Sequence, residues 1–290
     1  MEWKSQLAKD LCTHTNSRNP VTGISKLAGK AVVESKNQSP PLEPLTIGEQ
    51  FGLRGIDIES NLEADAELRA VVDGYRIVVS NDVATRRQGE ALSKDLSQRQ
   101  RFSCFHEIGH LMLDAFRQRI EYRKAATPIS LIDHRVEHTE EEMLCDFAAS
   151  EFMIPTSLFS PMMDELPLCW RSVEYLSRVF DASLTVVLKR ILHSRNWKLN
   201  LVTFFPLDPE FPFHGFYVKD TRCSFGVPNY FRCGMIVEHG LLPSIANVYI
   251  DGVKRSEHVI LSGVHAMLES VKRRVGLGTF SVQSLVAIND

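Results

Sequence analysis

The sequence lacks several features that would assign a protein to a class before any motif is considered. Its apolar runs all fall short of the length that crosses a membrane, and the first residues, MEWKSQ, lack the apolar core of a secretory signal. We therefore expect a cytoplasmic protein with no membrane partner. The formal net charge of -3 over 290 residues gives no overall preference for nucleic acid, although a local basic patch is compatible with it.

Paired cysteines are also missing. The chain has six cysteines and no Cys-x-x-Cys spacing, so we expect reduced thiols and no disulfide framework. The six are Cys12, Cys104, Cys145, Cys169, Cys223 and Cys233.

What the sequence does contain is a His-Glu-x-x-His motif at 106–110. On a helix, His106 and His110 lie one turn apart on the same face and can aim at a single Zn²⁺ ion. Glu107 is the predicted catalytic residue, because a carboxylate beside a zinc-bound water can act as general acid and base. A structural histidine pair is the alternative, but apolar neighbours such as Phe105 and Ile108 predict a helix packed into a core, where an unpartnered imidazole is costly.

A third ligand is expected on a second helix, from about Thr139 to Ile154. Glu142 would complete a site of two histidines and one carboxylate, with Glu141 as the next candidate. Asp146, one turn further on, could accept the outer N–H of a ligand histidine. Alternatively, Thr139-x-x-Glu142 is a capping box and the run of three glutamates is a solvated helix start.

Strand patterns precede the motif and dominate the last third of the chain. Alternation over 55–59, and over 68–72 and 75–79 around Asp73-Gly74, predicts a small antiparallel sheet. This sheet either offers an edge to an extended substrate or is a plain structural hairpin. Further strands are expected at 199–205, 215–218, 235–237 and 247–250, whereas 259–274 also shows apolar residues at helical spacing.

These residues resemble a known family. Arg99-x-Arg101-Phe102, the His106-Glu107-Ile-Gly-His110 motif, and the run from Glu142-x-x-Cys-Asp146 to Met153-Ile-Pro155 are similar to the ImmA/IrrE-type zinc metallopeptidases. The resemblance covers about 45–195, and the pair of helices expected over 173–191 resembles a helix-turn-helix or a packed helical hairpin. Departures are Cys145 for the usual alanine and Ala148 for the usual phenylalanine.

With this resemblance we predict an α+β fold in three parts. A zincin-like metallopeptidase domain occupies 1–155, a helical hairpin 156–196, and an α+β sensor-like or dimerisation domain 197–290. The resemblance implies a regulatory peptidase that cuts a helix-turn-helix transcriptional repressor and so releases stress-response, phage-defence or mobile-element genes. The competing class is a zinc-stabilised DNA- or protein-binding regulator, or a toxin-antitoxin component, without peptidase activity.

Three finer hypotheses concern activation and catalysis. Lys254-Arg255 and 272–274, with Tyr249 and Phe280 nearby, either bind single-stranded DNA as an activator or are solvated surface. A thiolate in zinc's fourth position would silence the site, and we considered Cys12, Cys223 and Cys233 for it against the alternative of ordinary thiols. A second group that stabilises the oxyanion is expected among three residues between the two ligand helices: Tyr122, His134 and His138.

Overall fold

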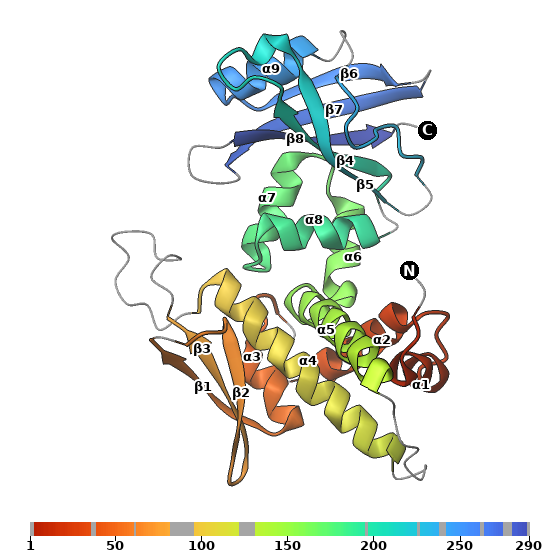
Figure 1. Cartoon of the computed structure of the whole chain (residues 1–290), viewed down its shortest axis with the longest axis vertical. Coiled ribbons are helices and arrows are strands. Elements are labelled where there is room, and N and C mark those ends of the chain that lie inside the picture. Colours follow the sequence, from red (N-terminus) through yellow and green to blue (C-terminus); the bar gives the residue numbers. More distant parts are fainter. Residues whose placement is uncertain are drawn as a thin grey trace. The chain divides into compact units, whose positions relative to one another are not determined.

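The computed structural model describes residues 3–35, 39–60, 62–81, 96–121, 131–194, 197–224, 227–237, 242–261, 264–274 and 280–288. The chain forms two compact units, 1–159 with 176–186 and 160–175 with 187–290. Each unit holds one β-sheet with helices, so the chain is a mixed α+β protein (Figure 1). None of the helices in the described ranges combines the length and the apolar character that a membrane span requires. The predicted limits at 155/156 and 196/197 stay a prediction.

Two long helices carry the predicted motifs in the first unit. The His-Glu-x-x-His motif lies in α4 (Gln98–Glu121), and Glu142 lies in α5 (Leu131–Met153). Because α5 begins eight residues before Thr139, the three glutamates lie inside the helix, and the capping-box alternative is wrong. The shorter helices of this unit are α1 (Gln6–His14), α2 (Pro20–Glu34), α3 (Pro44–Gly48) and the 3-10 turn η1 (Glu49–Phe51).

The sheet of this unit is mixed, not purely antiparallel as predicted. Its strands are β1 (Leu53–Glu59), β2 (Ala66–Val71) and β3 (Gly74–Ser80), in the order β1-β3-β2. The β2–β3 hairpin is antiparallel as expected, but β1 pairs with β3 in parallel. A strand that precedes a hairpin can pair with the second strand of that hairpin, which places the two in parallel. Side chains alternate in the same way in parallel and antiparallel strands, so the sequence alternation does not predict strand direction.

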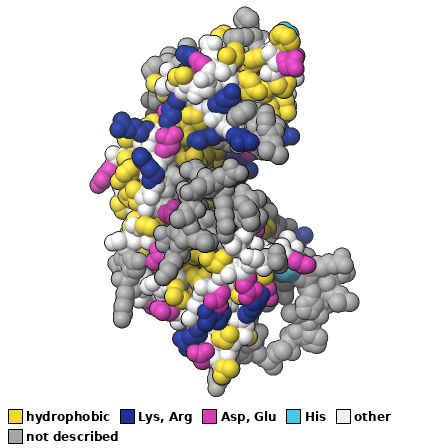
Figure 2. Space-filling view, turned by 90° about the vertical axis from the view of Figure 1, so that its left-hand side faces the viewer, with side chains coloured by type: hydrophobic (Ala, Val, Ile, Leu, Met, Phe, Trp, Pro, Cys, Tyr) yellow, Lys and Arg dark blue, Asp and Glu magenta, His cyan; other side chains and the backbone are white. Residues whose placement is uncertain are grey.

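Charged side chains on this sheet pair with one another. Arg76 forms a two-point contact with Asp57, at 2.6 and 2.7 Å, and Arg69 contacts Glu59 and Glu67. In Figure 2 basic and acidic side chains lie beside each other toward the lower end of the molecule, where this sheet is. The sheet therefore presents no patch of a single sign there.

The helix α4 lies between the sheet and α5, and it packs on β2, β3 and α5 (Figure 1). Phe105, Ile108 and Leu113 are fully buried, as the apolar spacing predicts. At the crossing, a Cβ on Gly109 would lie 3.1 Å from the Cα of Cys145 and 3.3 Å from its carbonyl oxygen. The absent side chain at 109 is thus what allows the two backbones to approach so closely.

Two buried charged residues tie α4 and α5 to distant parts of the chain. The guanidinium of Arg101 donates to the carbonyl of Leu42 at 2.9 Å, and its Nε lies 3.4 Å from the carboxylate of Asp181. The carboxylate of Glu140 accepts the backbone N–H groups of Lys4 and Ser5, at 2.8 and 2.9 Å. The second contact fixes the start of α1, whose N-cap is Ser5, to the middle of α5.

The second unit is a five-stranded antiparallel sheet with helices. Strands in the order β5-β4-β8-β7-β6 span Phe216–Cys223, Leu199–Pro206, Phe280–Ile288, Val264–Arg274 and Arg255–Leu261. Helix α9 (Leu242–Asp251) packs on β7 and β8 over an apolar core that includes Phe204, Phe216 and Leu268. Along the chain, α6 (Thr156–Glu165), α7 (Trp170–Val179) and α8 (Leu184–His193) follow α5, and the 3-10 turn η3 (Pro212–His214) follows β4.

In this region the strand expected at 247–250 is wrong, and the open alternative at 259–274 is decided. The segment 247–250 is helical, because Ile245 and Val248 recur on one buried face of α9 and this packing outweighs the β-propensity of Val, Tyr and Ile. The segment 264–274 is a strand: Leu268 faces the core shared with α9, whereas the carboxylate of Glu269 accepts the backbone N–H of Trp170 at 2.7 Å. With both faces of β7 covered, polar alternation is lost and helical spacing arises by coincidence.

A matched pair of glycine substitutions tests the α4–α5 crossing. Gly109→Ala should lower the free energy of unfolding by about 1–2 kcal/mol, because the new methyl group meets backbone atoms of Cys145 that have no room to yield. Gly29→Ala, in the interior of α2 with nothing within 4 Å of the added Cβ, should instead raise it by about 0.5–1 kcal/mol. Urea titrations of both variants measure this, and equal shifts would contradict the close crossing.

A second prediction concerns Glu140 and pH. Burial raises the pKa of Glu140, but hydrogen bonds from Ser5 and Lys4 outweigh it and bring the pKa below its ordinary value of 4.5. A depressed carboxyl pKa stabilises the fold above the unfolded pKa, and this contribution is lost as the pH falls through the folded value. Glu140→Gln should therefore cost about 2 kcal/mol at pH 7, and the difference from wild type should shrink as the pH falls below about 4.5. The exposed Glu63→Gln is the control, with no expected change in urea midpoint.

Candidate metal centre

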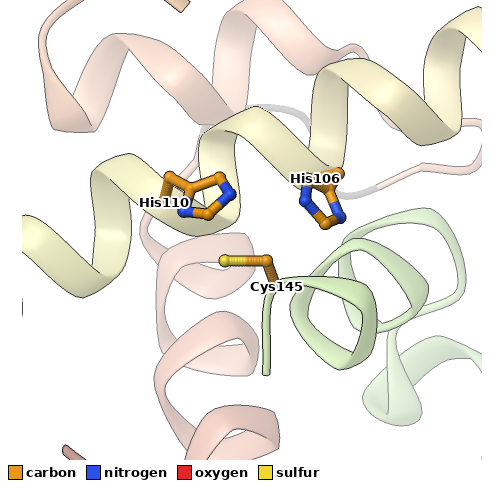
Figure 3. Close-up of side chains that lie close together, drawn as sticks. All are labelled: His106, His110 and Cys145. Carbon is orange, nitrogen blue, oxygen red and sulfur yellow. The ribbon is translucent and has the colours of Figure 1, made fainter. Parts of the chain in front are cut away.

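Two imidazoles from α4 lie on one face of that helix, turned toward α5 (Figure 3). The ring centroids of His106 and His110 are 5.1 Å apart, with the ring planes at 70°. This arrangement follows from their four-residue spacing, since one helical turn places both side chains on the same side. The side chains of both residues are mostly shielded from solvent, 17% and 22% exposed.

The carboxylate of Glu142 faces both rings. One of its oxygens lies 3.2 Å from Nε2 of His106 and the other lies 3.4 Å from Nε2 of His110. The two Nε2 atoms thus converge on a single carboxylate, which is the donor set that the sequence predicts for zinc. Asp114 and Asp10, by contrast, contact residues of their own helices.

The outer nitrogens of both rings also have carboxylate partners. Nδ1 of His106 lies 3.0 Å from Asp146, and Nδ1 of His110 lies 3.3 Å from Glu141. Glu141 in turn accepts from both terminal nitrogens of Arg117. Carboxylates on Nδ1 fix the tautomer that leaves Nε2 free to bind a metal, so the arrangement fits a metal site through its outer partners as well.

The sequence pattern predicts Asp146 in this position but not Glu141 or Arg117. Glu141, predicted as an alternative to Glu142, instead faces the far nitrogen of His110. Two signals pointed that way: a second histidine needs an outer acceptor, and Arg117 lies seven residues after His110 on the same face of α4.

The acidic side chains make the site attractive to positive charge. Burial lowers the pKa of His106, but the hydrogen bond and charge of Asp146 outweigh it and raise that pKa. The hydrogen bond to Glu141 raises the pKa of His110. Burial of Glu141 opposes its ionisation, yet the hydrogen bonds from His110 and Arg117 bring its pKa to about 2. A divalent cation supplies the positive charge that these carboxylates favour.

The predicted general base lies in the same region. Burial raises the pKa of Glu107, the two histidines lower it, and the negative charges of Glu142 and Glu67 raise it further. Its pKa therefore lies above the ordinary value for a glutamate. Glu67 belongs to β2, so that strand lies near enough for its charge to act on the site.

A thiol completes the group of metal-binding side chains. Ligand atoms of His106, His110 and Cys145 all lie within 4.8 Å of one another, a group that does not include Glu142. Cys145 is fully buried on α5, and its sulfur lies on the His110 side of the pair (Figure 3). Burial raises the pKa of this thiol, and the charges of Glu141 and Glu142 raise it further. Cys12, Cys223 and Cys233, which we had considered for such a position, do not belong to this described group.

The other predicted residues are only partly described. Tyr122 and the side chain of His134 lie outside the described residues. Nδ1 of His138 lies 3.7 Å from Glu142, and its side chain is 76% exposed. His138 is therefore the candidate for a further oxyanion group that lies beside the site.

The basic residues of the second unit make contacts within that unit. Lys254 contacts Glu174 at 3.3 Å, Arg255 contacts Asp251, Nζ of Lys272 lies 4.9 Å from the ring centre of Tyr249, and the guanidinium of Arg273 lies 4.9 Å from that of Trp170. These contacts show how the side chains are held. DNA binding by these residues stays a prediction, and Phe280's side chain lies outside the described residues.

Comparison with known proteins agrees with the motif. Residues 91–192 match the family model Peptidase_M78, described as the IrrE N-terminal-like domain. A search of curated proteins gave no match. A solved structure described as a Mycobacterium tuberculosis transcriptional regulator aligns with a TM-score of 0.58 at 12% identity, over 98% of this chain and 80% of that one. At this identity the likeness concerns the fold.

Removal of an outer carboxylate tests the metal centre. Asp146→Ala should lower zinc affinity about 10- to 100-fold, because His106 loses the partner that orients its ring. Competition with a chelating indicator measures this. Asp10→Ala, which removes an equivalent carboxylate from α1, should leave the affinity unchanged. Equal affinity in all three proteins would show that Asp146 does not support a metal.

Proposed function

Because residues 91–192 belong to the IrrE N-terminal-like peptidase family, we propose that this chain is a zinc-dependent endopeptidase that cleaves a protein partner. The observation that carries the proposal is the convergence of both Nε2 atoms on Glu142 while both Nδ1 atoms face other carboxylates. If the histidine pair served only to pack the core, its four ring nitrogens would not each need a carboxylate partner.

His106, His110 and Glu142 would hold the zinc ion. When bound, zinc acts as a Lewis acid that acidifies a water molecule and polarises the peptide carbonyl. Glu107 takes the proton of the attacking water and delivers it to the leaving amine. Its raised pKa suits both halves of that transfer, because a carboxyl group of higher pKa is a better base for the water and still releases the proton afterwards.

An extended substrate would bind along β2. Among the described strands, β2 pairs with β3 alone, so one of its edges has no strand partner. It packs against α4, the helix of the His-Glu-x-x-His motif. A peptide added as a further strand would gain main-chain hydrogen bonds and present its backbone to Glu107. This favours a substrate segment that is unfolded or easily unfolded over a folded surface.

The partner we propose is a helix-turn-helix transcriptional repressor, whose cleavage would release stress-response, phage-defence or mobile-element genes. The support is the resemblance of the motifs described above. The trigger stays a prediction, single-stranded DNA included. The competing class, a zinc-stabilised regulator or toxin-antitoxin component, has the same donors but no use for a general base.

Glu107→Gln separates the two classes. The variant should keep its metal and still bind the repressor, but cleavage should fall by about 10²- to 10⁴-fold, because the proton of the attacking water loses its acceptor. Co-expression with a helix-turn-helix protein encoded nearby, followed by mass measurement of that partner, gives the result. Metal content of both proteins is measured in parallel.

The matched control is Glu63→Gln, the same change at an exposed position of the first unit, which should cleave as wild type does. If Glu107→Gln shortens the partner at the wild-type rate, Glu107 does not act as the general acid and base. Binding without cleavage by wild type, with zinc present, would favour the regulator.

A further inference from the structure

Four potential metal ligands come from two facing helical turns. His106 and His110 are four residues apart on α4, and Glu142 and Cys145 are three residues apart on α5. Both spacings bring side chains to one face of a helix. The two helices run in opposite directions, since His106 contacts Asp146 near one end of the crossing and Arg117 contacts Glu141 near the other. The facing pairs therefore meet where Gly109 lies against Cys145.

We propose that the Cys145 thiolate is a fourth protein ligand of the metal held by His106, His110 and Glu142, and that it closes the coordination sphere in the resting protein. The proposal rests on the metal centre of the proposed function and adds its regulation. The observations behind it are that ligand atoms of His106, His110 and Cys145 lie within 4.8 Å of one another and that the Cys145 side chain lies below the histidine pair, with its sulfur on the His110 side, in Figure 3.

The distances are compatible with ligation after a small contraction. Zinc–sulfur and zinc–nitrogen bonds of about 2.3 and 2.0 Å in a tetrahedron place sulfur and nitrogen about 3.5 Å apart. The ligand atoms of His106, His110 and Cys145 are at most 4.8 Å apart, so movements of about 1 Å, shared among these three side chains, bring them into range.

The surroundings of the thiol favour ligation over other roles. Cys145 is fully buried beside the two histidines, where a bound cation would be its nearest positive charge. A thiol that binds a metal ion does so as a thiolate, so its proton would pass to solvent as the sulfur–metal bond forms. Cys145 stands where the resembled motif has alanine, so its sulfur is a donor atom that the motif itself does not supply.

With all four positions filled, the resting protein would have no site for the catalytic water and would be inactive as a peptidase. Two histidines, one glutamate and one thiolate fill a tetrahedral site, as in structural zinc centres, and leave no position for water. Departure of the Cys145 side chain would reopen that position and leave His106, His110 and Glu142 as the three protein ligands of the proposed catalytic centre. A regulatory peptidase needs such a separation between holding its metal and using it.

Cobalt(II) spectroscopy of the full, reduced chain tests the ligand without reference to activity. With one equivalent of Co²⁺, wild type should show the intense near-ultraviolet thiolate-to-metal absorption that histidine and carboxylate ligands do not produce. Cys145→Ser and Cys145→Ala should lose it and bind Co²⁺ about tenfold or more weakly. Cys104→Ser, a buried cysteine of α4 outside the described ligand group, should retain it. His106→Ala should lose the absorption, which assigns it to this centre.

The outcomes separate this proposal from the proposed function. If wild type binds one Co²⁺ without thiolate absorption, Cys145 is not a ligand and the three-ligand centre stands. If the absorption persists in both Cys145 variants, another cysteine is the ligand and the assignment fails. If wild type binds no Co²⁺ at all, the metal centre and the fourth ligand fail together. The wild-type spectrum decides the first and third cases even if a variant does not fold.

Discussion

The close crossing of α4 and α5 is the contact on which the candidate metal centre depends. Each helix supplies a pair of side chains at a spacing of about one turn, but the pairs meet only because Gly109 lets the backbones approach. A larger residue at 109 would push Glu142 away from both imidazoles at once. The chemistry of the centre is therefore set by a residue that offers no functional group of its own.

Three consecutive glutamates on α5 serve three different purposes. Glu140 accepts the N–H groups that precede α1, Glu141 joins His110 to Arg117, and Glu142 faces both Nε2 atoms. Successive helical residues point about 100° apart, so a run of identical residues is distributed over most of the circumference of the helix. A rotation of α5 about its axis would disturb all three contacts, which together fix its orientation toward α4.

Much of this arrangement could be predicted from the sequence. The parts that could not be predicted depend on tertiary packing. The His106–His110 pair and the contact of Asp146 follow from local helical spacing, and they required only that two helices meet. Glu141 and Cys145 escaped because their roles depend on how α5 is rotated against α4, which spacing along one helix does not determine. In the second unit, the strand expected at 247–250 is wrong because the packing of Val248 within α9 outweighs its β-propensity. Leu268 lies at helical spacing because both faces of β7 are covered, which removes the alternation that marks a strand.

Helix α5 packs on α1 and α2, which lie outside the segment that matches the family model. The recognisable segment, 91–192, contains every donor of the centre but excludes α1, α2, α3 and the sheet. Ile24 and Ala28 of α2 are fully buried, α2 packs on α5, and Arg101 donates to a carbonyl at Leu42. A fragment cut at the limits of sequence similarity would expose the apolar side of α5 and leave two buried charges without partners. The segment that matches the family model, 91–192, is therefore smaller than the packed unit that carries the candidate metal centre, and that unit includes α1.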